Sequence, residues 1–205
     1  MKEKTCQTRC GTIRYWVSAS NPDTITLVFL PGLTADHRLF DKQIQYFENR
    51  YNVIVWDAPA QGSSWPFRFD FDLFDKAKWL NDILIREGIT KPVIVGQSMG
   101  GYVGQAYAQL YPDKMTGFVS IDSAPLQRSY VTAVEIWLLK RMEPVYAHYP
   151  WKWLLKSGSE GVATSDYGRN LMREMMLTYD GNQKRYAQIA GHGFRILAAA
   201  IGKNL

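Results

Sequence analysis

The sequence predicts an α/β protein with a mostly parallel, doubly wound sheet and a helical cap. Up to residue 125, short apolar runs rich in β-branched residues alternate with amphipathic helical stretches, a pattern typical of parallel strands covered by helices on both faces. After Pro125 this alternation stops, and helical pieces punctuated by proline and glycine continue to Ile201. We therefore expect a core over 1–126, a cap over 127–201 and the start of a return to the core at 202–205.

Composition narrows the classes of function. The chain has 205 residues, is 46% hydrophobic and 21% charged, and carries a net charge of +5 on scattered basic residues, so nucleic acid is not an expected partner. It has no apolar run long enough to insert into a membrane and no signal-peptide pattern at its start. Cys6 and Cys10 are the only cysteines, and two free thiols indicate a reducing, cytoplasmic setting. No ligand cluster suggests a metal ion, and no motif suggests a cofactor.

Each core element has its own signal. Residues 3–9 and 12–18 alternate between polar and apolar as two strands around a bend, whereas the later strands are almost wholly apolar. The expected strands cover residues 3–9, 12–18, 26–30, 52–56, 92–95 and 117–122. Of the helices between them, one carries an apolar stripe from Leu39 to Phe47, and the next begins at a capping arrangement of Asp72 and Asp75.

A strand runs directly into a helix at residues 93–101, and Ser98 lies there at the centre of a Gly-x-Ser-x-Gly motif. Such a turn forces the serine into a strained conformation with positive φ and exposes its hydroxyl. Gly96 and Gly100 stand where a Cβ would collide with neighbouring backbone. The helix directs its free N–H groups, beginning with that of Met99, at the space where negative charge would develop on a substrate oxygen. The motif indicates a nucleophile, and the alternative is a glycine-rich turn with a passive serine.

Aromatic residues are dense in the predicted cap. They are Tyr130, Trp137, Tyr146, Tyr149, Trp151 and Trp153. A helical insertion after a strand could form a lid over Ser98 at the carboxyl ends of the strands, with some of these side chains lining an apolar pocket. The alternative is that they form the core of a small helical layer.

Four motifs occur in the order and spacing of the α/β-hydrolase superfamily, which the chain resembles over residues 3–125. They are Leu-Pro-Gly-Leu at 30–33, Asp-Ala-Pro-Ala-Gln-Gly-Ser-Ser at 57–64, Gly-Gln-Ser-Met-Gly-Gly at 96–101 and Ile-Asp-Ser-Ala-Pro at 121–125. The chain looks like the lidded branch of esterases, cofactor-free haloperoxidase-like enzymes and C–C bond hydrolases. The resemblance implies that Ser98 is the nucleophile and that the backbone N–H groups of Leu33 and Met99 form the oxyanion hole.

The sequence departs from the family pattern at three places. Pro31 stands where the family often has histidine, and Ala60 and Gln61 replace a usual Gly-His pair; both positions shape loops. The family also continues past its cap into two strand-helix units that carry the catalytic acid and histidine, whereas this sequence stops at Leu205 as the next strand is approached. We therefore expect Ser98 to be well placed but to lack an activating base.

Three histidines are available as a base. His37 lies at the start of the helix after the oxyanion loop, on the active-site side, and its short tether makes it a residue of the pocket rim rather than a base. His148 and His192 belong to the cap, where we expect surface or core-edge positions. His192 could approach Ser98 if the cap folds down over the serine.

Asp122 ends the strand after the elbow helix and is the candidate catalytic acid, because some relatives place the acid there while others carry a separate acid further on. Gln97, next to the serine, and Trp65, in the loop after the strand at 52–56, join His37 as candidates for the substrate pocket. The strand that ends at Asp122 would also leave an unpaired sheet edge, which favours self-association.

These observations predict a serine-nucleophile hydrolase. Ser98 would attack an ester, a thioester or another activated carbonyl of a small, apolar substrate, and water would resolve the resulting acyl-enzyme. Two alternatives stay open. The chain could be a non-catalytic or truncated binding module with the same fold, or a lyase or haloperoxidase-type enzyme built on it.

Overall fold

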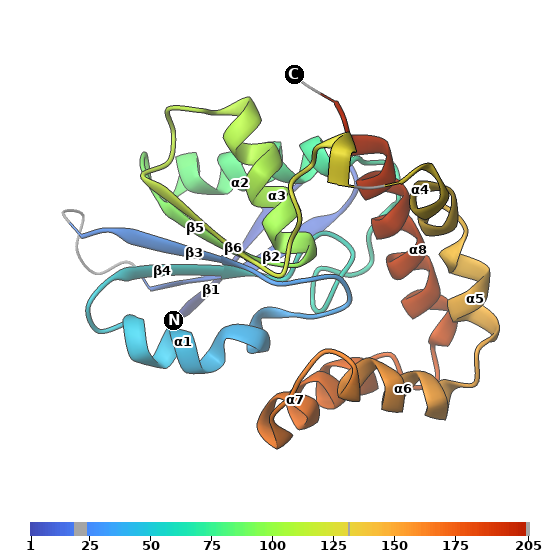
Figure 1. The fold of residues 1–205 in the computed structure, drawn as a ribbon. Helices are drawn as coiled ribbons and strands as arrows, with labels where there is room; N and C mark the ends of the chain where they lie inside the picture. Colours follow the sequence, from blue (N-terminus) through green and yellow to red (C-terminus); the bar gives the residue numbers. More distant parts are fainter. Residues whose placement is uncertain (19–23, 131, 204–205) are drawn as a thin grey trace.

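One sheet organises the residues that the computed structural model describes, which are 1–18, 24–130 and 132–203 (Figure 1). Its strands are β1 (Lys2–Gln7), β2 (Thr12–Ser18), β3 (Thr26–Leu30), β4 (Asn52–Trp56), β5 (Val93–Gln97) and β6 (Gly117–Ile121). Their order across the sheet is β1-β2-β4-β3-β5-β6. β2 pairs antiparallel with both β1 and β4, while the pairs from β4 through β3 and β5 to β6 are parallel. The predicted, mostly parallel sheet is confirmed.

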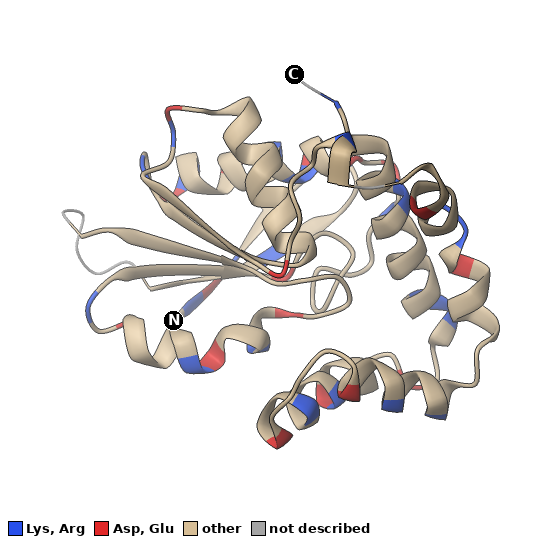
Figure 2. Cartoon of the chain, in the orientation of Figure 1, with Lys and Arg blue, Asp and Glu red and all other residues tan. Residues whose placement is uncertain are grey.

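The parallel strands are apolar because helices cover both faces of the sheet. The covering helices are η1 (His37–Phe40), α1 (Asp41–Phe47), α2 (Leu73–Arg86) and α3 (Met99–Leu110). Alternate residues of β4 face opposite layers: Ile54 and Trp56 join the cluster that includes α2 and α3, whereas Val53 and Val55 pack with η1 and α1. β3, β4 and β5 contain no charged residue, and Figure 2 shows the charges on the helices and loops around them.

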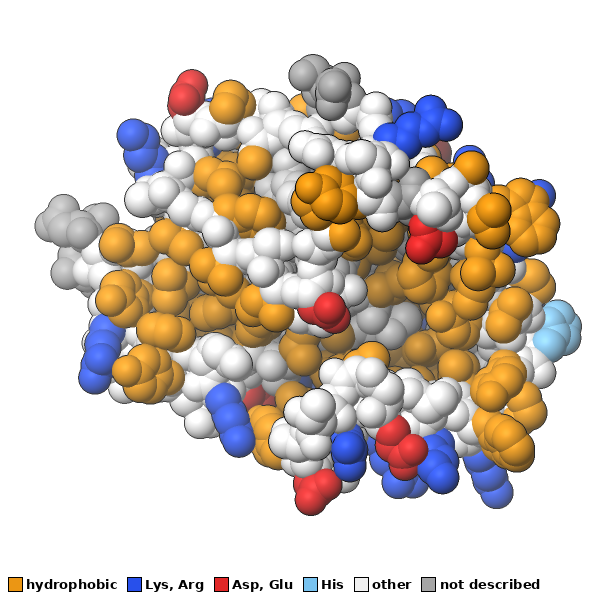
Figure 3. All heavy atoms as spheres, viewed as in Figure 1, with side chains coloured by type: hydrophobic (Ala, Val, Ile, Leu, Met, Phe, Trp, Pro, Cys, Tyr) orange, Lys and Arg blue, Asp and Glu red, His pale blue; other side chains and the backbone are white. Residues whose placement is uncertain are grey.

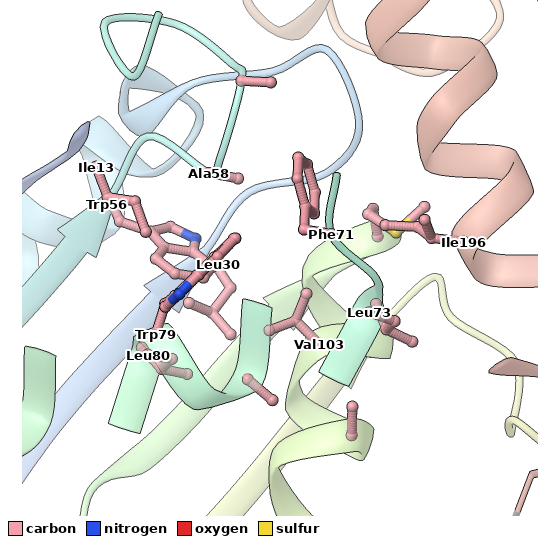
Figure 4. Close-up of a cluster of buried hydrophobic side chains, with 14 of the residues drawn as sticks. Ile13, Leu30, Trp56, Ala58, Phe71, Leu73, Trp79, Leu80, Val103 and Ile196 are labelled. Atoms are coloured by element: carbon pink, nitrogen blue, oxygen red, sulfur yellow. The ribbon is translucent and has the colours of Figure 1, made fainter. Parts of the chain in front are cut away.

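The chain after β6 is helical. Its elements are η2 (Arg128–Tyr130), α4 (Ala133–Leu139), α5 (Met142–His148), α6 (Trp151–Glu160), α7 (Asp166–Leu177) and α8 (Gln183–Ala200). α8 packs against α5 and also reaches α2 and α3, and Figure 4 shows its Ile196 beside Phe71 and Leu73 in the main hydrophobic cluster. This cluster contains residues from both sides of position 126. A division into core and cap at that position therefore remains a prediction from the sequence. None of the described helices combines the length and hydrophobicity needed to span a bilayer.

β6 forms one edge of the sheet, and its outer residues are exposed. Val119 is 46% and Ile121 is 42% exposed, and in the described part of the chain β6 pairs with β5 alone. Figure 3 shows hydrophobic side chains gathered over this region of the molecule. The exposed edge that the sequence predicts beyond Asp122 is therefore present in the described residues, with backbone N–H and C=O groups available for pairing.

Candidate active site

Ser98 occupies the tight turn between β5 and α3. Its backbone angles are φ 49° and ψ −116°, so the predicted positive φ is confirmed. Glycine is required on both sides, because a Cβ on Gly96 would collide with the backbone of Gly100, and one on Gly100 would collide with the carbonyl of Leu30. The Ser98 N–H donates to the Ile121 carbonyl at 2.8 Å. The strained serine is thus held between the strands that flank β5.

Two residues that share a cavity with Ser98 have backbone N–H groups without a protein acceptor among the described residues. Leu33, in the loop after β3, and Met99, the first residue of α3, both line a cavity that contains Ser98. Among the described residues, neither N–H donates a hydrogen bond to another protein group. The start of α3 adds the positive end of a helix dipole. Leu33 and Met99 are the two residues that the resemblance assigns to an oxyanion hole.

Gln61 is a buried residue whose part in this site the sequence did not reveal. It is 1% exposed, and its side chain reaches from the loop after β4 into the loop after β3. There its Nε2 donates to the Gly32 carbonyl at 3.3 Å, and its Oε1 accepts the Thr34 N–H. Both of these partners are neighbours of Leu33. The motif at 57–64 marks the position as loop-forming, but only the fold shows which loop its side chain holds.

Ser98 lies where two cavities meet. The first has a volume of about 540 Å³ and extends under the cap, and none of its lining side chains is charged. Its apolar wall includes Tyr102, Leu154, Met176, Tyr186, Phe194 and Leu197. The second has a volume of about 610 Å³ and is more polar, with Lys42, Gln43 and Asp122 in its lining. Figure 3 shows a recess bordered by hydrophobic side chains between the core and the cap. Because core and cap residues line both cavities, the cap lies over the carboxyl ends of the strands.

His37 lies outside both cavities, away from the pocket rim where the sequence placed it. Its Nδ1 and its backbone N–H are both 2.8 Å from Oδ1 of the buried Asp57, and its ring stacks on Trp16 with centroids 3.7 Å apart. Burial opposes protonation of His37, but the hydrogen bond and the charge of Asp57 outweigh it and raise the pKa of His37. Burial also opposes ionisation of Asp57, but His37 and the Ser63 N–H lower the pKa of Asp57. This pair holds the loop after β3.

Trp65 also lies outside both cavities, whereas Gln97 lines the second one. The Trp65 ring packs under the guanidinium of Arg185 on α8, 4.7 Å from the ring centroid. Arg185 in turn donates to the Gly62 carbonyl at 2.9 Å. The predicted pocket role of Trp65 is therefore replaced by a contact that ties α8 to the loop after β4.

The two cap histidines do not line the cavities that contain Ser98. His148 is exposed at the end of α5. His192 is buried in α8, where its ring lies 4.5 Å from that of Phe71 in a tightly packed region that also contains Lys76. Burial, reinforced by the positive charge of Lys76, lowers the pKa of His192 to about 4. None of the three histidines lines either of the two cavities described above that contain Ser98.

Asp122 lines the second cavity together with Ser98. It follows β6 with φ 55°, and its side chain is exposed. In the part of the chain that the structure describes, its carboxylate makes no hydrogen bond or ion pair. A triad acid acts by orienting a histidine, and no histidine lines this cavity. Its role as the acid stays a prediction.

One group of side chains has the composition of a metal site. The ligand atoms of Asp36, His37 and Asp57 lie within 4.8 Å of one another. Both oxygens of Asp36 accept from the guanidinium of Arg38, at 2.9 and 2.7 Å, and Oδ2 of Asp57 accepts the Ser63 N–H at 2.7 Å. The carboxylate oxygens that could bind a metal ion therefore already accept hydrogen bonds from the protein. The group is an internal hydrogen-bond network that fixes the loop after β3.

The cap aromatics fall into two groups, and neither sequence interpretation holds for the whole set. Tyr146 lines the apolar cavity, and Trp151 packs against the main hydrophobic cluster. The other four are on the surface, where Tyr130 is 62%, Trp137 55%, Tyr149 40% and Trp153 68% exposed. The aromatic wall of the pocket combines Tyr146 with Tyr102, Tyr186 and Phe194, of which the last two lie on α8.

Comparison with known families agrees with this geometry. The family model of the alpha/beta hydrolase fold matches residues 25–172, which is well over half of the chain. The chain therefore belongs to this family, and both the resemblance and the predicted fold class are confirmed. The matched region includes the elbow at Ser98, the loop at Leu33 and Asp122 at the end of β6.

Three relatives illustrate the extent of the similarity. The uncharacterized hydrolase YugF of Bacillus subtilis (strain 168) is 28% identical over 182 residues, which cover 87% of this chain and 65% of YugF. The proline iminopeptidase of Arabidopsis thaliana is 31% identical over 116 residues, which cover 51% of this chain and 28% of that protein. A thermophilic esterase from Thermogutta terrifontis, solved with malate bound, has the same fold, with a TM-score of 0.76 and 18% identity over 95% of this chain and 72% of the esterase. The chain thus spans less than two thirds of the length of the two curated relatives.

Proposed function

We propose that this chain supplies the nucleophile, the oxyanion hole and the apolar pocket of a serine hydrolase. The observation that supports this best is Ser98 at positive φ, with the unpaired N–H groups of Leu33 and Met99 beside it. The Ser98 Oγ would attack an activated carbonyl carbon while its proton passes to a base, and the two N–H groups would bind the oxygen that becomes negative. Collapse of this intermediate releases the protonated alcohol or thiol, and water then hydrolyses the acyl-enzyme and restores Ser98.

The cavities support a small ester or thioester with an apolar acyl group as substrate. The first cavity has no charged lining and falls in the size range of small-molecule pockets. The second cavity, with Lys42 and Gln43 in its wall, suits a more polar leaving group. Ser98 lines both, so a bound ester would place its carbonyl at their junction.

The base of this reaction comes from elsewhere than the three histidines of the chain. His37 is hydrogen-bonded to Asp57, His148 lies on the surface, and His192 is buried against Phe71. Asp122 keeps its place as the proposed acid because it shares a cavity with Ser98. Without an activating base the serine hydroxyl is a poor nucleophile, so acylation by this chain alone should be slow.

Hydrolysis of p-nitrophenyl esters with acyl chains of increasing length tests the proposal. We expect an acyl adduct on Ser98 by intact mass, fastest with apolar acyl groups and absent from Ser98→Ala. Ser120→Ala is the matched control, because Ser120 is exposed on β6. Adduct formation that persists in Ser98→Ala would refute the nucleophile. Tight binding of apolar esters with neither an adduct nor released p-nitrophenol would favour a binding module.

We also propose a cytoplasmic location and self-association through the edge strand. Cys6 and Cys10 are buried free thiols, as a reducing compartment would keep them. The exposed β6 edge, with Val119 and Ile121, would pair with a second copy. Sedimentation of the parent and of Val119→Lys tests the second point, since a lysine on the edge should shift the protein towards monomer. Identical sedimentation of the parent and Val119→Lys would rule out self-association through β6.

A further inference from the structure

One buried side chain holds the peptide that joins Gly32 to Leu33. Nε2 of Gln61 donates to the Gly32 carbonyl at 3.3 Å, and the Ala35 N–H donates to the same oxygen at 3.3 Å. In a trans peptide the carbonyl and the following N–H point in opposite directions. Holding the Gly32 carbonyl at Gln61 therefore turns the Leu33 N–H away from Gln61. In the described part of the chain, the Leu33 N–H donates to no protein acceptor.

The same side chain holds the residue that follows Leu33. Oε1 of Gln61 accepts the N–H of Thr34, which has φ 63°, in the left-handed region that threonine rarely adopts. The bond stabilises this conformation directly after Leu33, whose own N–H has no protein acceptor among the described residues. A single planar amide thus fixes the backbone on both sides of Leu33.

Gln61 itself stands on a rigid support. Its backbone N–H donates to the Ala58 carbonyl at 2.8 Å, and its carbonyl accepts the Ser64 N–H at 2.8 Å. The Ser64 hydroxyl donates to the Asp57 carbonyl at 2.7 Å and accepts the Arg14 N–H at 2.8 Å. The loop after β4 is therefore bonded to β2, and the amide of Gln61 projects from a fixed frame.

We propose that Gln61 is a positioning residue, whose side-chain amide orients the Gly32–Leu33 peptide so that the Leu33 N–H faces the oxyanion formed at Ser98. This inference rests on the proposed function of Ser98 and Leu33. An oxyanion donor stabilises developing charge well only when it is already aligned, because realignment during the reaction would consume the gain. Glutamine suits the position because the site needs one donor and one acceptor on the same group.

The variants separate the two bonds. Gln61→Leu removes both, Gln61→Glu keeps the acceptor for Thr34 and loses the donor, and Gln61→His keeps one ring donor and one ring acceptor. Gln105→Leu is the matched control, because Gln105 also joins two backbone groups, the Ala124 carbonyl at 2.9 Å and the Leu126 N–H at 2.8 Å. Its partners lie in the loop after β6 rather than beside Leu33.

The first readout is the rate at which a fluorophosphonate labels Ser98 in the full chain, followed by intact mass at a temperature where melting curves show each variant folded. Loss of one oxyanion donor lowers such rates by about 100- to 1000-fold. We expect a fall of at least about tenfold in Gln61→Leu and Gln61→Glu, and recovery to within about threefold of the parent in Gln61→His. Gln105→Leu should keep the parental rate even where its Tm falls. A parental rate in Gln61→Leu, or in Gln61→Glu if the leucine variant does not fold, overturns the inference.

The second readout does not depend on activity. The Leu33 amide should give one sharp NMR cross-peak in the parent and in Gln105→Leu, and a broadened or doubled one in Gln61→Leu and Gln61→Glu, since the peptide would no longer hold one orientation. An unchanged Leu33 signal in both Gln61 variants overturns the positioning role whatever the labelling shows. A parent that is labelled at other residues but not at Ser98 would refute the proposed function, and the Leu33 signal would then decide the orientation of the peptide separately.

Discussion

The surroundings of Ser98 differ between the side that would bind an oxyanion and the side that would transfer a proton. On the proposed oxyanion side, Met99 follows the strand-to-helix turn, and the buried amide of Gln61 bonds to Gly32 and Thr34 on either side of Leu33. On the side where a base and an acid would act, Asp122 is exposed, and no histidine lines either cavity.

The difference follows from the kind of group that each side uses. Oxyanion donors are backbone N–H groups, so the order of β3, β5 and α3 is enough to place them. Proton transfer needs a side chain of suitable pKa within hydrogen-bonding reach. In this fold the three histidines lie in other surroundings, and His37, for example, is hydrogen-bonded to Asp57. A serine can therefore be strained and well placed while it lacks its base.

A substitution that disrupts the turn at Ser98, on the proposed oxyanion side, should have the largest effect on stability and on labelling. Gly100→Ala would place a Cβ on the Leu30 carbonyl, so the elbow could not keep its conformation. We expect the free energy of unfolding to fall by about 3 kcal/mol and labelling of Ser98 to be lost. Gly117→Ala is the control, because a Cβ there would meet only Val93, at 3.7 and 3.8 Å. Equal urea midpoints for the two variants would show that the elbow tolerates a side chain.

The His37–Asp57 pair, which holds the loop after β3, should make the stability of the protein depend on pH. Because the pKa of His37 is raised, its contribution is complete below the ordinary value of 6.5 and is lost as the pH rises through the folded-state value. Because the pKa of Asp57 is lowered, its contribution is present above the ordinary value of 3.8 and is lost as the pH falls through the folded-state value. The pair should therefore stabilise most between about pH 4 and 6.5.

Melting curves of the parent and of His37→Phe measure this effect. The phenyl ring can still stack on Trp16 but carries no charge, so the Tm difference between the two proteins should be largest in that window and should shrink as the pH rises above it. A difference that stays constant from pH 5 to pH 9 would show that the pair does not titrate as described.

A substitution of Asp122, on the side of Ser98 where an acid would act, should have the smallest effect on stability and on labelling. Asp122→Asn removes a charge that is exposed and has no partner among the described residues. We expect the free energy of unfolding to change by less than about 0.5 kcal/mol and the labelling rate of Ser98 by less than about twofold. A tenfold fall in that rate would mean that the carboxylate already assists Ser98, and the contrast between the two sides would weaken.

Features set by neighbouring residues were predictable from the sequence. The positive φ of Ser98 follows from glycines two residues to either side, and the capping box of Asp72 and Asp75 at the start of α2 is present as expected. The apolar runs of β3, β4 and β5 were recognisable because strands covered by helices on both faces disfavour charged side chains, and these three contain none.

Features that depend on distant contacts were not predictable. The sequence placed His37 at the pocket, but its partner Asp57 is 20 residues away. Gln61 stood out only as a departure from a family motif, since its bond to Thr34 joins two loops 27 residues apart. The exposure of Trp137 and Trp153 depends on which face each cap helix packs against its neighbours, α8 for α4 and α7 for α6, and aromatic content alone does not specify that face.

The central claim is that this chain places Ser98 without activating it, and labelling of the chain by a fluorophosphonate tests it most directly. Intact mass should show slow modification of Ser98, with the same rate in His37→Ala, His148→Ala and His192→Ala once each variant is confirmed to be folded. Loss of a working base costs several orders of magnitude in rate. Rapid labelling of the parent that disappears in one of these variants would show that the chain contains its own base, and would contradict the account.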